Sequence, residues 1–407
     1  MFSVAEVEQI ILNLVQPFDP ELDSEVIHLS RSQNRILVED IHSPLDFPHW
    51  HNSAMDGYAL RYADLANLSE LKIAIATAQI PAGSAIAQTL PQGECMRIFT
   101  GGRLPIGADT VIMQEDTEPI DNVLYLKTKP SQGEYVRHQG EFITAGTKLI
   151  NAGTKIGATK IGALAAARCQ QIKVYRQPKI AIISTGNELV SLDSSSPLQS
   201  GQIIDSNLHT LSALVTQSGA IAMTFGAIPD HKAKLIEVMQ QAIATADLVI
   251  STGGVSVGDY DYIDELLASL GADIHVRSIA IKPGKPLTVA TIGKILYFGV
   301  PGNPVSSMMS FWRFIRGAIA KLNGGNPSYW YPQFIKATTT EDLHAQGRRE
   351  TYLWGHLSYQ KGHPVFQPVK NYSSGNLISV IGANSLAVMR VNQTYVPAGD
   401  ECIIMLI

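Results

Sequence analysis

The stretch that decides the fold runs from residue 246 to residue 261 and reads ADLVISTGGVSVGDYD. It begins with a short apolar run typical of a buried strand, continues into a glycine-rich loop, and is followed by the helix-like segment YIDELLASL. A strand that leads through a loop into a helix is the repeating unit of parallel α/β sheets. The stretch therefore predicts such a sheet, with polar residues at the carboxyl end of one strand.

The same rhythm extends in both directions, from about residue 178 to residue 322. The strand-like runs are KIAIIST, AIAMTFGAI, ADLVIST, IHVRSIAI and KILYFGV, and the helical segments between them include NLHTLSALVTQ and HKAKLIEVMQQAIA. This alternation predicts a central, doubly wound, mainly parallel sheet with helices on both faces. We expect this α/β domain to cover residues 178–327.

The regions on either side predict β structure. Residues 46–146 consist of short alternating stretches separated by turn clusters, which indicates an inserted β module. Helical patterns flank this module, so residues 1–45 and 147–177 are expected to form one small mixed α/β domain. Short alternating strands return in residues 328–407, which predict a C-terminal β domain. The fold class is thus a multidomain α/β chain with two β modules.

Composition narrows the range of functions. The chain has 407 residues, enough for roughly two to four domains. Its net charge of −5 argues against general nucleic-acid binding, which needs a basic excess. Charged residues make up only 16%, against about 25% in an average soluble domain. A thinly charged surface favours a homo-oligomer, in which part of the surface is covered.

The cysteines and the N-terminus predict a soluble, cytoplasmic protein. Cys95, Cys169 and Cys402 are far apart and show no spacing typical of zinc sites or disulfide frameworks. The first residues form an amphipathic helical pattern with a capping box at Ser3 and Glu6, without the basic start of a signal peptide. No apolar run approaches the ~18 residues that would span a bilayer.

Conspicuous polar residues follow the predicted strands, at the edge where open parallel sheets bind ligands. The acidic ones are Glu188, Asp230, Asp259 and Asp261. The candidate oxyanion-binding residues are Thr185, Gly186, Ser206, Gly253, Gly254, Ser256, Lys282, Lys285, Pro301, Gly302, Asn303 and Pro304. Glycines and a helix N-terminus favour an anion, whereas the acids would repel it unless a cation such as Mg²⁺ lay between them. The alternative is that the acids are helix caps and solvated loop ends.

Competing motifs are weaker. Residues 254–258 read GVSVG and match the GxSxG pattern of hydrolases, but two acids follow where an oxyanion hole would have to stabilise negative charge. His42, His49 and His51 lack the spacing or cysteine partners of a zinc site. A serine hydrolase and a zinc enzyme are therefore both disfavoured.

Several motifs together carry a resemblance to a known family. They are SAMDGYA at 53–59, FTGG at 99–102, STGNEL at 184–189, SGQIIDSN at 200–207, STGGVSVGDYD at 251–261, KPGKP at 282–286 and PGNPVSS at 301–307. RILVEDIHSP at 35–44 and GRRE at 347–350 are similar as well. The chain thereby resembles, nearly end to end, the molybdopterin molybdenumtransferase family, to which the gephyrin E domain belongs.

The resemblance implies an elongated, four-domain subunit that forms a homodimer with a composite site. It also implies that molybdate is inserted into adenylylated molybdopterin with release of AMP, assisted by Mg²⁺, and that other molybdenum cofactor biosynthesis proteins are partners. The family's catalytic positions fall on Asp56, Thr100, Glu188, Asp230 and Asp261, with Glu188 and Asp261 as metal ligands and Lys282 and Lys285 as the lysines.

Three departures from the family pattern concern the site. Phe142 stands where most members have Asp, unless Glu141 takes that role; Asn187 replaces a common Asp, and His51 replaces an acid. Two other readings stay open: a non-catalytic, gephyrin-like scaffold and an activity like that of molybdopterin adenylyltransferases. A scaffold need not keep Asp56, Asp261 and the two lysines, so their presence favours the enzyme.

Overall fold

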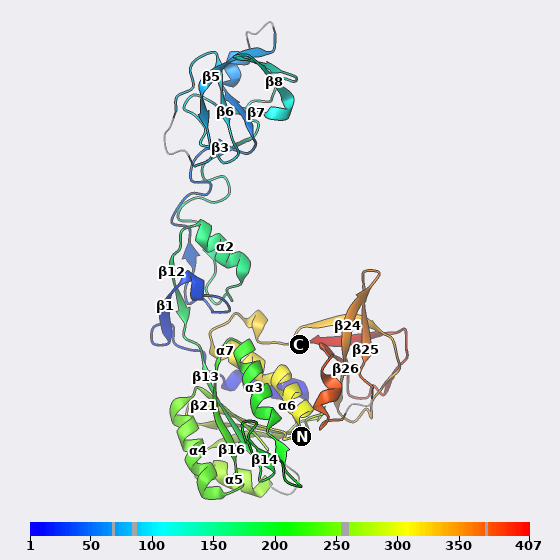
Figure 1. Ribbon diagram of the computed structural model, residues 1–407. Coiled ribbons are helices and arrows are strands. Elements are labelled where there is room, and N and C mark those ends of the chain that lie inside the picture. Colours follow the sequence, from blue (N-terminus) through cyan, green and yellow to red (C-terminus); the bar gives the residue numbers. More distant parts are fainter. Residues whose placement is uncertain (67–69, 84–87, 254–259, 371–372) are drawn as a thin grey trace.

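The computed structural model describes residues 1–66, 70–83, 88–253, 260–370 and 373–407, with the backbone alone at 260–262. Figure 1 shows an elongated molecule with a β module at one end and an α/β unit at the other. A small unit around α2 lies between them, and the C-terminal strands lie beside the α/β unit. The predicted fold class is confirmed, while the domain boundaries stay predictions.

A six-stranded sheet forms the centre of the α/β unit, in the order β16-β13-β17-β21-β20-β18. Its strands are β13 (Lys179–Thr185), β16 (Ile221–Ile228), β17 (Leu248–Thr252), β18 (Asp273–Ser278), β20 (Pro286–Ile292) and β21 (Ile295–Val300). The first four strands in the sheet order are parallel, and β20 runs antiparallel to both of its neighbours. The sheet is therefore mainly parallel, as predicted, although the sequence analysis did not identify β20.

Helices cover both faces of this sheet. They are α1 (Val4–Leu14), α3 (Ser206–Gln217), α4 (Lys232–Thr245), α5 (Tyr260–Ser269), α6 (Pro304–Ser310) and α7 (Arg316–Leu322), with a π-helical segment (Phe311–Ile315) joining α6 to α7. One core contains buried residues of α1, α3, α6 and α7, and a second contains those of α4 and α5. The two cores correspond to the two faces, which is the doubly wound arrangement.

Helix α1 packs differently from the prediction. Ser3 caps it, and the capping box with Glu6 is present. Its buried residues Val4, Val7 and Ile11 belong to the core of the α/β unit. The prediction grouped residues 1–45 with 147–177, but the apolar stripe of α1 lies on one helical face and is buried against the larger core instead.

The small unit joins two distant segments. Strand β1 (Ser24–His28) pairs with β12 (Gln171–Tyr175), and β2 (Ile41–His42) pairs with β11 (Lys148–Ile150). Helix α2 (Ala158–Ala166) contributes Leu164 to their shared core. The chain leaves this unit to form the β module and then returns to it.

The β module is a sheet in the order β7-β4-β6-β5-β9-β8. Its strands are β4 (Gly57–Leu60), β5 (Lys72–Ile80), β6 (Glu94–Ile98), β7 (Thr110–Met113), β8 (Thr117–Ile120) and β9 (Val123–Leu126), with β3 (Asn52–Ser53) and β10 (Val136–Arg137) paired nearby. Apolar clusters lie on both faces of the sheet, which explains why its strands alternate only partly between apolar and polar residues.

The C-terminal sheet has the order β19-β24-β25-β22-β28-β26, and an additional β24–β26 pairing closes it into a barrel. Its strands are β19 (Ile281–Lys282), β22 (Phe334–Thr339), β24 (Glu350–Gln360), β25 (His363–Pro368), β26 (Ser385–Met389) and β28 (Glu401–Leu406). Shorter pairs elsewhere are β14 (Leu189–Val190) with β15 (Ile203–Ile204), and β23 (Leu343–His344) with β27 (Tyr395–Val396). Strand β19 comes from the α/β segment, so the barrel is attached to that unit by backbone pairing.

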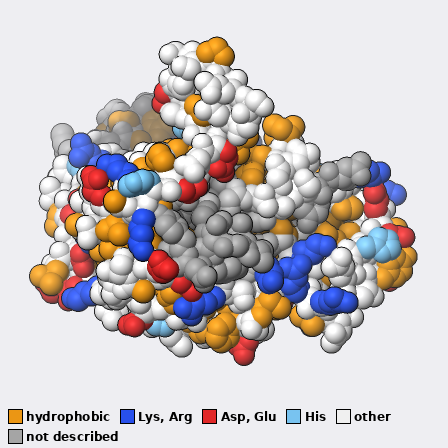
Figure 2. All heavy atoms as spheres, turned by 90° about the horizontal axis from the view of Figure 1, so that it is seen from below, with side chains coloured by type: hydrophobic (Ala, Val, Ile, Leu, Met, Phe, Trp, Pro, Cys, Tyr) orange, Lys and Arg blue, Asp and Glu red, His pale blue; other side chains and the backbone are white. Residues whose placement is uncertain are grey.

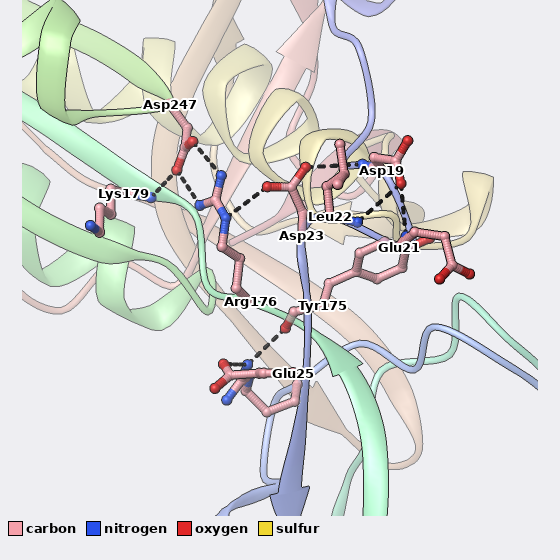
Figure 3. Close-up of polar contacts among 10 residues, drawn as sticks. Asp19, Glu21, Leu22, Asp23, Glu25, Tyr175, Arg176, Lys179 and Asp247 are labelled. Atoms are coloured by element: carbon pink, nitrogen blue, oxygen red, sulfur yellow. Dashed lines mark hydrogen bonds and ion pairs between the residues drawn. The ribbon is translucent and has the colours of Figure 1, made fainter.

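Arg176 marks the passage from the small unit to the α/β sheet (Figure 3). Its Nη1 and Nη2 each donate to the Asp247 carboxylate at 2.7 Å, and its Nε donates to Asp23 Oδ1 at 2.9 Å. Asp247 precedes β17 and Asp23 precedes β1. A bidentate pair fixes orientation as well as distance, so Arg176 orients the two units at their junction.

None of the helices in the described ranges has the length and apolar character needed to cross a membrane.

Candidate functional site

The carboxyl ends of four parallel strands meet at one edge of the α/β sheet. Thr185 lies in register with Ile228 of β16, and Thr252 of β17 lies in register with Ser184 and Val300 on either side. Thr185 is the last residue of β13, and Gly253 and Pro301 directly follow β17 and β21, so the three residues lie at the ends of neighbouring strands. The parallel order of these strands therefore places these three residues at one edge of the sheet, as the sequence predicts.

The loops at this edge touch through their backbones. Gly253 has φ +93°, and a Cβ there would lie 2.0 Å from the carbonyl oxygen of Thr185. A Cβ on Gly302 would lie 3.5 Å from the Cα of Gly253. Only glycine at position 253 satisfies both the conformation and the approach. The strand ends therefore form a compact floor.

Two acidic candidates lie beside this floor. Glu188 is exposed, and its carboxylate lies against Gly186, where a Cβ would be 2.6 Å from Glu188 Oε2. No hydrogen bond or ion pair joins that carboxylate to another described residue. The exposed Asp230 donates its backbone N–H to Asn187 Oδ1 at 3.1 Å. The amide oxygen of Asn187 thus connects the loop after β13 with the loop after β16. The carboxylate of an Asp at this position could accept the same hydrogen bond.

Asn207 connects three of the elements at the site, and the sequence analysis did not single it out. Its Nδ2 donates to Thr252 Oγ1 at 2.8 Å and to the Gly302 carbonyl at 2.7 Å. Thr252 Oγ1 in turn donates to the Pro301 carbonyl at 3.1 Å. Asn207 is the last residue of the motif SGQIIDSN. This motif is the feature of the sequence from which a role for Asn207 at the site could have been predicted.

Lys282 and Lys285 line a cavity of about 450 Å³ together with Pro301 and Asn303. Other lining residues come from the C-terminal segment and include Arg349, His344, Thr351 and Ser374. No acidic side chain is among its described lining residues. Neither lysine amine forms a hydrogen bond or ion pair with a described residue. The cavity is therefore positive and offers unused donors to an oxyanion.

Strand pairing brings Arg349 to the lysines. Ile281 and Lys282 of β19 pair in parallel with Glu350 and Thr351 of β24, and Arg349 Nη1 donates to the Ile281 carbonyl at 3.1 Å. Sequence reasoning quoted GRRE but assigned Arg349 no role. Figure 2, which views the molecule from the α/β end, shows groups of Lys and Arg side chains there, with acidic side chains nearby.

Asp56 and Thr100 form a second group, on the β module. Asp56 Oδ1 accepts from the Thr100 backbone N–H and from Thr100 Oγ1, both at 2.7 Å. These two bonds hold the pKa of the Asp56 carboxyl below its usual range, and the charge of Arg97 adds to the effect. The pair lies at the opposite end of the chain from the strand-end residues (Figure 1).

The departures from the family pattern have local partners. Phe142 is 59% exposed and packs against Phe47, with ring centroids 5.9 Å apart. Glu141 Oε2 accepts the His138 backbone N–H at 2.7 Å, and His51 Nδ1 accepts the Gln139 backbone N–H at 3.1 Å. Glu141 is therefore engaged by its own turn.

Part of the candidate site falls in the glycine-rich loop between β17 and α5. Gly254, Ser256 and Asp259 lie outside the described residues, and of Asp261 only the backbone, within α5, is described. Ser206 opens α3 and Pro304 opens α6, both at the strand-end edge. Within the described ranges, no three His, Cys, Asp or Glu side chains are grouped so that they could hold a metal ion.

Comparison with known proteins decides the family. The chain matches the MoeA N-terminal region (domains I and II) over residues 2–167, a probable molybdopterin binding domain over residues 181–321, and the MoeA C-terminal region (domain IV) over residues 336–407. In addition, relatives named molybdopterin molybdenumtransferase match the chain at up to 47% identity over its full length. The chain belongs to the molybdopterin molybdenumtransferase family. The resemblance stated from the sequence motifs is thus confirmed.

Individual relatives agree with this assignment. The chain is 47% identical to a molybdopterin molybdenumtransferase of Nostoc sp., over 100% of this chain and 94% of that protein. It is 33% identical to the one of Haemophilus influenzae, over 93% of this chain and 92% of that protein. A crystal structure of the molybdopterin biosynthesis MoeA protein of Pyrococcus horikoshii matches with a TM-score of 0.84 at 25% identity, over the full length of both chains.

Proposed function

We propose that this protein acts in molybdenum cofactor biosynthesis as a molybdopterin molybdenumtransferase. In this reaction it inserts molybdate into adenylylated molybdopterin and releases AMP. Membership in the family supports the reaction class, since the curated relatives carry that name. The described site supports the substrate class.

The observation that carries the proposal is the cavity of about 450 Å³ between the sheet edge and the barrel. Lys282, Lys285 and Arg349 line it, and no acidic side chain is among its described lining residues. Molybdate and the phosphates of an adenylylated pterin are oxyanions, and cationic donors bind such groups strongly. The glycine-rich floor beside the cavity lets a phosphate approach the backbone.

The acidic residues at the same edge support a role for Mg²⁺ in the proposed reaction. Glu188 is an exposed carboxylate with no described partner, and oxygen donors of this kind suit Mg²⁺. Glu188 and Asp261 would hold the ion, and its charge would favour departure of AMP. Asp230 lies on the adjacent strand end and is proposed to belong to the same acidic group.

The proposal includes a homodimer in the cytoplasm. Asp56 and Thr100 lie far from the cavity within one chain (Figure 1), so a site that uses both groups requires a second copy. In a two-fold dimer, the β module of one chain would approach the α/β unit of the other twice, which gives two equivalent sites.

Reconstitution tests the proposed function. The purified protein is mixed with adenylylated molybdopterin, molybdate and Mg²⁺, and AMP release is measured. We expect AMP only when all three are present. Binding of the adenylylated pterin without turnover would favour the scaffold, and formation of adenylylated molybdopterin from ATP without molybdate use would favour an adenylyltransferase-like activity.

A further inference from the structure

A second cavity, of about 470 Å³, lies where the small unit, the end of α7 and the chain's last strand come together. Lys155 comes from the small unit, Trp312, Arg316 and Asn323 come from the segment around α7, and Tyr329 follows that helix. This cavity has no lining residue in common with the cavity that contains Lys282 and Lys285. It is therefore a separate site.

Two cations in this cavity have no anionic partner among the described residues. Lys155 and Arg316 are both half-buried, and neither forms an ion pair with a described residue. No acidic side chain is among the described lining residues. Burial lowers the pKa of both groups, and for Lys155 the charge of Arg316 adds to the effect. A carboxylate or phosphate in the cavity would relieve this cost.

The rest of the wall suits a planar ring. The Arg316 guanidinium lies 5.6 Å from the centroid of the Trp312 ring, and Trp312 itself is only 8% exposed. Tyr329 lines the same cavity and is half-buried. Aromatic side chains next to cations favour ligands that combine a ring with a negative charge.

Asn323 is a buried polar residue of the cavity wall. It lines the cavity and is only 5% exposed, yet its Oδ1 has no hydrogen-bond partner in the described structure. That oxygen has almost no accessible surface, so it does not face the cavity. The groups available to a ligand are the two cations and the aromatic rings that line the cavity.

We propose that this junction cavity binds a small aromatic anion, with the anionic group between Lys155 and Arg316 and the ring against Trp312 and Tyr329. The volume lies within the range of pockets that take small-molecule ligands. Because the walls of the cavity come from the small unit and from the α/β unit, a bound ligand would contact both units at their junction.

Isothermal titration calorimetry, which measures the affinity of the full-length protein for phenyl phosphate, tests this proposal. Phenyl phosphate carries both a ring and an anion, inorganic phosphate carries only the anion, and benzyl alcohol carries only the ring. Benzoate distinguishes a carboxylate from a phosphate as the preferred anion. We expect phenyl phosphate or benzoate to bind more tightly than either single-feature probe.

Variants assign the binding to this cavity. Lys155→Gln and Arg316→Gln should each weaken binding of the preferred probe at least ~10-fold, because each removes a charge-assisted contact. Lys294→Gln removes an exposed charge elsewhere and should change nothing. Lys285→Gln removes a cation of the other, oxyanion-binding cavity. Binding that Lys155→Gln weakens should keep its affinity in Lys285→Gln, which separates binding in this cavity from binding at the sheet edge.

Three outcomes would overturn the proposal. One is the absence of binding of every probe at millimolar concentration to the folded protein. Another is unchanged affinity in Lys155→Gln, which decides the question alone if Arg316→Gln does not fold. The third is loss of binding in Lys285→Gln, which would place the probe in the cavity at the sheet edge.

Discussion

Lys285 is an exposed cation beside the half-buried Lys282, in a cavity whose described lining holds no acid to balance them. Because neither amine has a described partner, substituting one of them breaks no ion pair that stabilises the fold. Lys285→Ala should therefore leave the circular dichroism spectrum unchanged. It should weaken molybdate use in AMP release by roughly 10- to 100-fold, the value of a hydrogen bond to a charged group.

Lys294→Ala is the matched control, since Lys294 is an exposed lysine in the turn between β20 and β21. It should keep the molybdate dependence of the unmodified protein. Normal molybdate dependence in Lys285→Ala would remove this lysine from the proposed site.

Asp56 allows a prediction about protonation. Thr100 donates two hydrogen bonds to its ionised carboxylate and so lowers the pKa of Asp56. Thr100→Ala removes the hydroxyl donor and keeps the backbone donor, so the pKa of Asp56 should rise but stay below the usual value for Asp. Asp56 is then still fully ionised at neutral pH in the variant, and the difference in its protonation from the unmodified protein is seen only at acidic pH.

The measurement is an NMR titration of the Asp56 carboxyl carbon. Thr100→Ser keeps the hydroxyl and should titrate like the unmodified protein. A pKa that does not move in Thr100→Ala would mean that the side-chain bond contributes nothing to holding Asp56 ionised.

At the scale of elements, the turn after β17 is the most constrained connection of the site. Gly253→Ala would combine a positive φ with a Cβ placed 2.0 Å from the Thr185 carbonyl oxygen, which is backbone and cannot move aside easily. Gly271→Ala has a similar φ, +70°, with no atom within 4 Å of the new Cβ. The left-handed conformation alone costs an alanine about 1–2 kcal/mol.

Thermal unfolding separates the two effects. Gly271→Ala should lower the stability of the α/β unit by that amount, and Gly253→Ala should lower it more and reduce AMP release as well. Equal losses of stability in both variants, with activity kept in both, would show that the close approach at Gly253 is unimportant.

The elements of the site could be predicted because parallel strands place their loops at one edge. Local periodicity gave β13, β16, β17 and β21, and the topology then brought Thr185, Gly253 and Pro301 together. Arg349 could not be placed in this way. It reaches the lysine loop through the pairing of β19 with β24, a contact across 68 positions that no local pattern encodes.

The fact that local patterns do not encode long-range contacts also explains two other differences between the predicted and the observed fold. Helix α1 was predicted correctly as a helix, but its apolar face fits any core, and only the assembled structure shows that it packs on the α/β unit. Strand β20 was missed, although it pairs with both β18 and β21. Patterns along the chain thus predict elements more reliably than they predict partners.

For the whole molecule, the separation of the two candidate groups is the decisive feature. Asp56 and Thr100 lie on the β module, and Glu188, Lys282 and Lys285 lie on the α/β unit at the other end of an elongated chain (Figure 1). Arg176, paired with Asp247 and Asp23, holds the orientation of the small unit at the junction between them. One chain cannot join both groups without a large rearrangement, and the proposed two-fold dimer would join them by bringing the β module of one chain to the α/β unit of the other.

This arrangement predicts that two inactive variants restore each other. Asp56→Ala removes a group on the β module, and Asp261→Ala removes one on the segment of α5. In the proposed dimer each site would take its β module and its α/β unit from different chains, so a heterodimer of the two variants would contain one composite site with both substitutions and one with neither. Differently tagged variants are co-expressed, the heterodimer is purified, and AMP release is measured per dimer. Recovery to roughly half of the unmodified activity is expected from this symmetry. A folded heterodimer without activity would mean that each site takes both groups from one chain, and that the elongated chain must fold back on itself to work.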